Sequence, residues 1–231
     1  MILTKGLIRR LELESGDIFA VKGSGPAAWA CRTLIEPPTD RFHFGLIWMP
    51  VAEDNDRVIL ESQGEGTWLE TILDIVLHLI TKKGAVGKAV CIGRLSFYLG
   101  QDLEFYRPTQ LLKKLRRQAP AALSAYGRDS YGYDYISKLI VRALWKWVKV
   151  CIKAKRLRRL RVDEMPAVEQ GRALICTVAP DVGYQLIGAD LLPPGMPATP
   201  NAYAQLVKDG LLTKLGEDLV LKEVDDGLRP K

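Results

Sequence analysis

The chain has 231 residues, of which 48% are hydrophobic and 26% are charged, and its formal net charge is +6. This composition is that of an ordinary globular protein, and the length suits one domain with a sizeable core. Charge interrupts the N-terminal segment too early for a signal peptide, and no uncharged apolar stretch reaches the roughly 18 residues that span a bilayer. We therefore expect neither export by the general route nor a transmembrane segment.

In the first half of the chain, short apolar runs alternate with turn residues, which is typical of antiparallel strands. The predicted strands cover residues 18–23, 42–48, 58–62 and 89–95, with a helix over 27–35 that begins after Pro26. A hairpin turn at 54–56 predicts that the strand at 58–62 returns antiparallel beside the strand at 42–48. Residues 67–80 are apolar and fit either a strand or a helix.

The second half of the chain is predicted to be mostly helical. Pro108 suits the start of a helix over 108–118, which Pro120 should end. Residues 166–178 should return as a strand or loop to Cys176, a helix covers 200–211, and the tail is acidic. We find neither an internal repeat nor a low-complexity linker. The fold class is therefore α+β, with residues 1–231 forming a single domain.

The positive charge is concentrated in one segment. Ten basic residues and no acidic one lie between Asp134 and Asp163, so the rest of the chain carries a net charge of −4. Six of the ten recur at steps of three or four residues, which places them on one face of a helix: Lys138, Arg142, Lys146, Lys149, Lys153 and Arg156. Apolar residues, including Leu139, Ala143, Leu144, Trp147 and Val150, fall on the other side. The pattern predicts one amphipathic helix over about 133–160, within a basic element that reaches about residue 162.

Three interpretations of this basic helix remain open. It could pack on the core with a solvated basic face. It could lie on a membrane surface, because Trp145 and Trp147 suit an interface and the cations suit anionic headgroups. It could also contact an acidic protein surface; nucleic acid is not favoured, because the chain has no recognition motif.

Among the four cysteines, Cys176 has the most suggestive setting. Cys31 and Cys151 fall within predicted helices and Cys91 within a predicted strand, which favours inert packing. Cys176 ends an apolar run at a strand-to-helix transition, where helix N–H groups could stabilise a thiolate. With only His43 and His78 as histidines and no Cys-x-x-Cys pair, a metal site has little support, and we expect no cofactor.

A catalytic thiol needs a base within reach and a third group that orients the base. His43 opens the apolar strand at 42–48, and Glu61 ends the strand predicted to pair with it, so the carboxylate could receive an imidazole N–H across the ladder. Each residue also has an ordinary interpretation: His43 as a core histidine bonded to a backbone carbonyl, and Glu61 as a solvated strand end. His78 lies in an apolar element and is better explained as filling space.

Several motifs resemble the circularly permuted, papain-like branch of the NlpC-type cysteine hydrolases. They appear in the order of that family: Gly16-Asp17-Ile18, then Phe42-His43-Phe44-Gly45-Leu46-Ile47, Val58-Ile59-Leu60-Glu61, Tyr133-Asp134, Cys176 and Thr199-Pro200. The resemblance covers most of the chain. It implies a permuted papain-like fold with an antiparallel sheet packed against helices.

The same resemblance implies roles for particular residues. Cys176 would be the nucleophile, His43 the base, Glu61 the orienting acid and Tyr133 a substrate-positioning residue. It implies hydrolysis or transfer at an amide or ester acyl bond, in a peptidoglycan-like or lipid-like substrate. Because we expect no signal peptide, we expect the protein to be cytoplasmic or carried in a phage particle. A non-enzymatic docking module on the same fold is the alternative.

The sequence departs from the family pattern directly after the nucleophile. Pro180 has no N–H, so it conflicts with a helix in which Cys176 is the N-cap. The helix could instead begin at Pro180 and leave Cys176 a few residues ahead of it.

Overall fold

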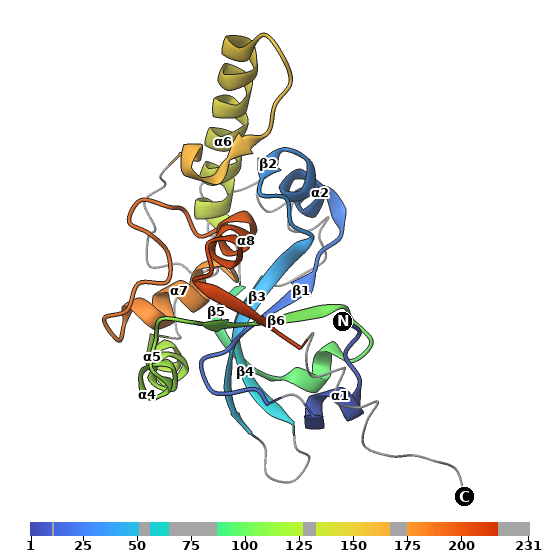
Figure 1. Ribbon diagram of the computed structural model, residues 1–231, viewed down its shortest axis with the longest axis vertical. Helices are drawn as coiled ribbons and strands as arrows, with labels where there is room; N and C mark the ends of the chain where they lie inside the picture. The colour runs from blue at the N-terminus through green and yellow to red at the C-terminus, as the bar shows by residue number, and fades with distance from the viewer. Residues whose placement is uncertain (11, 51–55, 65–86, 127–132, 167–174, 217–231) are drawn as a thin grey trace, which may run out of the picture.

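The computed structural model of the chain (Figure 1) describes residues 1–10, 12–50, 56–64, 87–126, 133–166 and 175–216. Most of the predicted hairpin turn, the ambiguous segment 67–80 and the acidic tail lie outside these residues. The fold is α+β, as the sequence predicts.

A six-stranded sheet forms the centre of the molecule, in the order β5-β4-β3-β1-β6-β8. Every neighbouring pair within it is antiparallel. The strands are β1 (Ile18–Lys22), β3 (Arg41–Pro50), β4 (Arg57–Gly64), β5 (Gly87–Arg94), β6 (Leu103–Pro108) and β8 (Leu212–Leu215). A separate parallel pair joins β2 (Ile35–Glu36) to β7 (Leu160–Arg161).

Helices cover both faces of this sheet. They are α1 (Lys5–Arg10), α2 (Gly25–Thr33), α4 (Lys113–Arg116), α5 (Gln118–Tyr126), α6 (Tyr133–Ala154), α7 (Val178–Gln185) and α8 (Pro200–Lys208), with short 3-10 turns η1 (Leu95–Tyr98) and η2 (Val162–Glu164). Figure 1 shows α4, α5 and α7 on one side of the sheet and α1 on the other, while α6 stands out from the body of the molecule.

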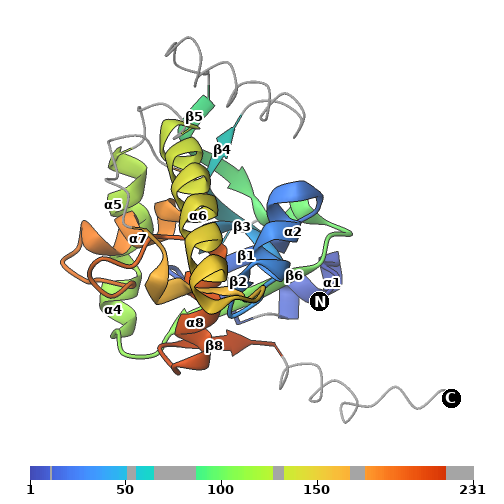
Figure 2. The same cartoon turned by 90° about the horizontal axis from the view of Figure 1, so that it is seen from above.

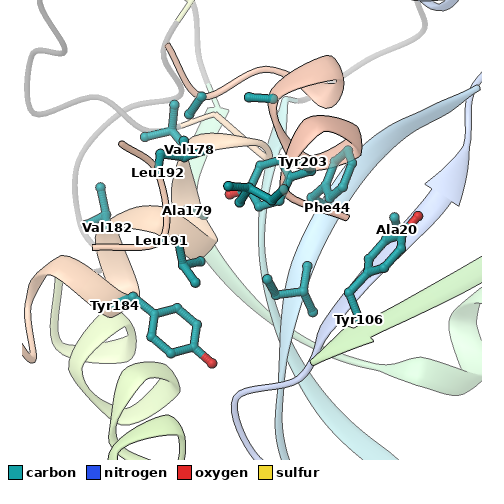
Figure 3. Packing of buried hydrophobic residues seen from close by; sticks show 14 of the residues in the cluster. Ala20, Phe44, Tyr106, Val178, Ala179, Val182, Tyr184, Leu191, Leu192 and Tyr203 are labelled. Carbon is teal, nitrogen blue, oxygen red and sulfur yellow. The ribbon is translucent and has the colours of Figure 1, made fainter. Parts of the chain in front are cut away.

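Strand alternation divides the buried side chains into two cores. Ile18 and Ala20 of β1 belong to the larger core, which α5, α7 and α8 complete. Phe19 and Val21, which point to the opposite face, belong to a smaller core under α1 and η1. Figure 3 shows part of the larger core, where side chains of α7 and α8 meet the sheet.

The Gly16-Asp17 motif ties the start of β1 to the helical layer. Tyr184 at the end of α7 donates its hydroxyl proton to the carbonyl of Gly16 at 2.6 Å. The Asp17 carboxylate is fully buried and accepts two hydrogen bonds from Arg107, at 2.7 and 2.8 Å. A buried charge needs such a partner, so this motif is a structural anchor between β1, β6 and α7.

Three predictions from prolines and periodicity are wrong. Pro108 ends strand β6 and does not begin a helix, because its missing N–H is tolerated at a strand end. Pro120 lies in the first turn of α5 and does not end a helix, since the N–H groups of a first turn have no intrahelical partner. Helix α6 begins at 133 as predicted but stops at Ala154, where Lys155 takes a positive φ of 50°, and not near residue 160.

A substitution of Gly45, at the centre of β3, would test how tightly the smaller core packs. A Cβ at this position would lie 2.4 Å from Cε1 of Phe19 and 2.6 Å from the carbonyl oxygen of Leu60. We expect Gly45→Ala to lower the free energy of unfolding by about 1–3 kcal/mol, measured by urea denaturation.

The matched control is Gly93→Ala on β5, where a Cβ would meet its neighbours at 3.4 Å or more. This variant should change the free energy of unfolding by less than about 0.5 kcal/mol. Equal losses in both variants would contradict the packing explanation.

Candidate active site

The pairing of β3 with β4 brings His43 and Glu61 together. Gly45 lies opposite Glu61 in the register, so His43 is a diagonal neighbour of Glu61 on the same face of the sheet. The imidazole Nε2 is 2.6 Å from Oε2 of Glu61. The Glu61 side chain is 2% exposed and that of His43 is 24% exposed. The solvated-Glu and carbonyl-bonded-His interpretations therefore do not describe this site.

Tyr98 is a third member of this cluster that the sequence did not reveal. It ends η1, directly after β5, and its hydroxyl donates to the same Oε2 of Glu61. Its ring centroid lies 6.0 Å from that of His43 and 5.6 Å from that of Phe19. No motif or periodicity marks this tyrosine, because it lies in a 3-10 turn whose place beside β4 depends on the tertiary fold.

A β-bulge near the start of β3 lies next to His43. The register of β1 with β3 runs from Val21–His43 to Lys22–Arg41 and skips Phe42. Bulges are frequent beside active sites, because they redirect backbone and side-chain groups. Here the carbonyl of Phe42 accepts a hydrogen bond from the Sγ of Cys176 at 3.7 Å. Cys176 therefore lies at the end of β3 that carries His43.

Cys176 occupies a tight turn just before α7. Thr177 is the N-cap, and the N–H groups of Val178 and Ala179 both donate to the carbonyl of Ile175, at 3.0 and 2.9 Å. The helix begins at Val178, so Cys176 is not its N-cap and the helix does not start at Pro180. Pro180 lies inside the first turn and is compatible with it, since N–H groups there lack intrahelical acceptors.

The pKa of His43 depends on both the Cys176 thiol and the Glu61 carboxylate. Burial lowers the pKa of His43, but hydrogen bonds to Cys176 and Glu61, together with the charges of these two groups, raise it overall to about 10. Because Nε2 faces Glu61, Nδ1 is the ring nitrogen left for the thiol. A histidine that stays protonated at neutral pH favours a thiolate beside it.

Cys31, on α2, provides the contrast. Burial, together with the nearby charge of Cys176, raises the pKa of Cys31 to about 12. Cys31 is therefore a protonated packing residue at neutral pH. Cys151 on α6 donates to the carbonyl of Arg158 at 3.7 Å, and Cys91 lies on β5. Both are in the elements that the sequence predicts for them.

A tyrosine from α8 holds the turn that carries the thiol. The Tyr203 hydroxyl donates to the carbonyl of Thr177 at 2.7 Å, and the Tyr203 ring stacks on Phe44 at 4.6 Å between centroids. Figure 3 shows these two rings side by side. Phe44 is the neighbour of His43 on β3, so a single side chain connects the thiol-bearing turn to the histidine-bearing strand.

The remaining sequence candidates are placed as follows. Tyr133 is the first residue of α6, but its side chain is outside the description. His78 lies outside the described residues altogether. Within the described part of the chain, no group of three or more His, Cys, Asp or Glu side chains could hold a metal ion.

The site is thus a cysteine beside a histidine that a buried carboxylate orients. No protein-family model matches the chain, and no curated protein sequence is significantly similar to it. The geometry of the site is what indicates its chemical class.

The titration of His43 tests the ion pair directly. With only two histidines in the chain, its ring signals can be followed by NMR and assigned with a His78→Gln variant. We expect His43 to remain protonated well above pH 7, and Cys176→Ala to lower its pKa because the thiolate partner is lost. A His43 that titrates near 6.5 in both proteins would contradict the pairing.

The raised pKa of His43 also predicts how the free energy of unfolding changes with pH. The folded-state pKa of His43 lies above the ordinary value of 6.5. Its stabilising contribution is therefore complete below pH 6.5 and is lost as the pH rises toward 10. The free energy of unfolding of the wild type should fall over this range more than that of His43→Gln, measured by urea denaturation.

Tyr203 and Tyr184 form a matched pair for testing the turn. Both are buried, and each donates its hydroxyl proton to one backbone carbonyl, but the acceptor of Tyr203 lies in the turn that carries Cys176 and that of Tyr184 is Gly16. Either Tyr→Phe change should lower the free energy of unfolding by about 1–3 kcal/mol. Only Tyr203→Phe should also slow the alkylation of Cys176 by iodoacetamide, followed by mass spectrometry. A purely structural role would give equal alkylation in the two variants.

Proposed function

We propose that this protein is a cysteine hydrolase or acyltransferase that cleaves an amide or ester acyl bond. The observation that carries the proposal is the position of His43, whose ring interacts with the buried Glu61 carboxylate and with the Cys176 thiol. This is the arrangement that an activated thiolate nucleophile requires: a base next to the thiol and an acid that orients the base.

In the first step, the Cys176 thiolate attacks the carbonyl carbon of the substrate, and a carbon–sulfur bond forms. The negative charge moves to the carbonyl oxygen, where backbone N–H groups at the start of α7 would stabilise it. When the tetrahedral intermediate collapses, the bond to the amine or alcohol breaks. The His43 imidazolium gives its proton to this leaving group.

In the second step, the thioester on Cys176 is resolved. Neutral His43 takes a proton from water or from an acceptor alcohol or amine, whose oxygen or nitrogen attacks the thioester carbon. The carbon–sulfur bond breaks, the thiolate returns, and the imidazolium pairs with it again. Water as acceptor makes the protein a hydrolase, and another acceptor makes it an acyltransferase.

Glu61 and Tyr98 would act through the histidine. The Glu61 carboxylate fixes the orientation of the ring through Nε2 and favours the imidazolium. The Tyr98 hydroxyl, which shares the same carboxylate oxygen, restricts the rotation of the Glu61 side chain. We assign both as positioning residues, with Tyr133 retained as a candidate for substrate contact.

The resemblance to permuted NlpC-type hydrolases supports the same chemistry and suggests the substrate class. A peptidoglycan-like amide or a lipid-like acyl group, in a bacterial or phage setting, fits that resemblance. The alternative is a catalytically silent module on the same fold, whose working surface is the basic helix. The two proposals differ in whether a covalent acyl-enzyme forms.

Intact-mass spectrometry after mixing with p-nitrophenyl butyrate tests the proposal. We expect a rapid release of p-nitrophenol that is stoichiometric with protein, together with a gain of one butyryl group on Cys176. Cys176→Ala should abolish both signals, and His43→Ala should slow the release by about 100-fold or more, since general acid–base groups contribute about that much.

The control is Cys91→Ser, which removes a partly exposed thiol and should leave the burst unchanged. A butyryl group on Cys91 alone, or an undiminished burst in Cys176→Ala, would refute the assignment of the nucleophile. Absence of any acyl-enzyme with this ester and with peptidoglycan-type amides would favour the silent module.

A further inference from the structure

Helix α6 carries apolar side chains on two different sides. On one side, four of them pack against the larger core: Leu139, Ala143, Trp147 and Val150. The indole Nε1 of Trp147 also donates to the carbonyl of Arg158 at 2.9 Å. This side attaches the helix to the domain.

The second apolar side is exposed. Five side chains at helical spacing form it, with exposed fractions from 38% to 71%: Val141, Leu144, Trp145, Val148 and Ile152. We call this set the apolar stripe. Leu144, which the sequence places on the side away from the row of cations, is 47% exposed and belongs to this exposed side. An exposed row of this kind on one helix marks an interaction surface.

A row of cations runs beside the apolar stripe. Lys146, Lys149 and Lys153 follow at steps of three and four residues, and Lys149 and Lys153 are exposed. The Nζ of Lys149 lies 5.0 Å from the ring centroid of Trp145, so the stripe and the cations are in contact. The helix therefore presents an apolar band with a positively charged border.

The position of α6 leaves this border accessible. In Figure 1 the helix stands out from the rest of the molecule, and in Figure 2, seen from above, it lies in front of the sheet. No described helix is long and apolar enough to cross a bilayer. An exposed apolar band of this length would thus lie along a surface and would not pass through one.

We propose that the apolar stripe and the adjacent lysines dock the protein on the surface of an anionic lipid bilayer. The apolar side chains, with Trp145 among them, would enter the boundary between headgroups and acyl chains, and the lysines would contact anionic headgroups. This inference does not depend on the proposed acyl chemistry. It assigns a site of attachment whether or not Cys176 reacts.

Charge complementarity selects lipid over a second copy of the chain. The segment between Asp134 and Asp163 contains no acidic residue, so a pair of α6 helices from two copies would offer no anion to either cationic row. An acidic protein surface would form ion pairs with the lysines, but it would also need an apolar surface to bury the five side chains of the apolar stripe. An anionic bilayer offers acyl chains to the apolar stripe and anionic headgroups to the lysines.

Co-sedimentation of the full chain with vesicles tests this proposal. We expect binding to phosphatidylcholine vesicles that contain phosphatidylserine, little binding to phosphatidylcholine alone, and a blue shift of tryptophan fluorescence on binding. High salt should weaken the binding, because the headgroup contacts are screened. The Cys176→Ala variant should bind like the wild type.

Two variants of α6 separate the contribution of the lysines from that of the apolar stripe, and each has a control variant elsewhere on the surface. Lys149→Gln/Lys153→Gln and Val148→Ser/Ile152→Ser should each reduce binding by more than about tenfold. The controls, Lys114→Gln/Lys208→Gln and Leu112→Ser, remove equivalent exposed groups outside α6 and should bind like the wild type. All these side chains are at the surface, and circular dichroism verifies that each variant folds.

Three results would overturn the proposal. One is equal binding to both kinds of vesicle. Another is undiminished binding of both α6 variants. The third is the absence of vesicle binding together with a solution dimer, seen by light scattering, that Val148→Ser/Ile152→Ser disrupts; this would assign the stripe to a second copy of the chain.

Discussion

A carboxylate with almost no contact with water organises this site. Glu61 is 2% exposed in the middle of a sheet, where an unpaired charge would cost several kcal/mol. The fold meets this cost with two donors from different elements, the imidazole of His43 on β3 and the hydroxyl of Tyr98 on η1. The absence of a side chain at Gly45 leaves room for the Phe19 ring on the same face. The histidine is therefore oriented by the need to satisfy a buried charge, before any substrate is present.

The Cys176 thiol is held by a separate set of contacts. The turn at Cys176 depends on the first turn of α7, on the Tyr203 hydroxyl from α8 and on the Thr177 side chain, which donates to the carbonyl of Ala198 at 2.9 Å. The two halves of the site meet at the bulge of Phe42, whose carbonyl faces the thiol. Their contact produces the raised pKa of His43, because each half supplies one of its two hydrogen-bonding partners.

Sequence reasoning found the parts of the structure that depend on local pattern. The alternating strands around Ile18, His43 and Leu60 were predicted, and so was the approach of Glu61 to His43, because it depends only on the pairing of adjacent strands. Strands β6 and β8 were missed: Glu104 and Arg107 break the apolar run of β6, and β8 is a short edge strand. Tyr98 and Tyr203 were missed because their roles arise from tertiary contacts with Glu61 and Thr177. The two sides of α6 could not be separated either, since periodicity shows which residues share a face but not which face the core covers.

The order of the site residues along the chain has a consequence for biosynthesis. The carbonyl of Phe42 and the thiol of Cys176 are 134 positions apart, and the tyrosine that holds the thiol follows still later. A nascent chain emerging from the ribosome presents His43 and Glu61 first, and Cys176 only after most of the strands of the sheet have been made. Closing so long a loop is slow relative to forming local contacts. Cys176 therefore stays apart from His43 until α7 and α8 dock on the sheet.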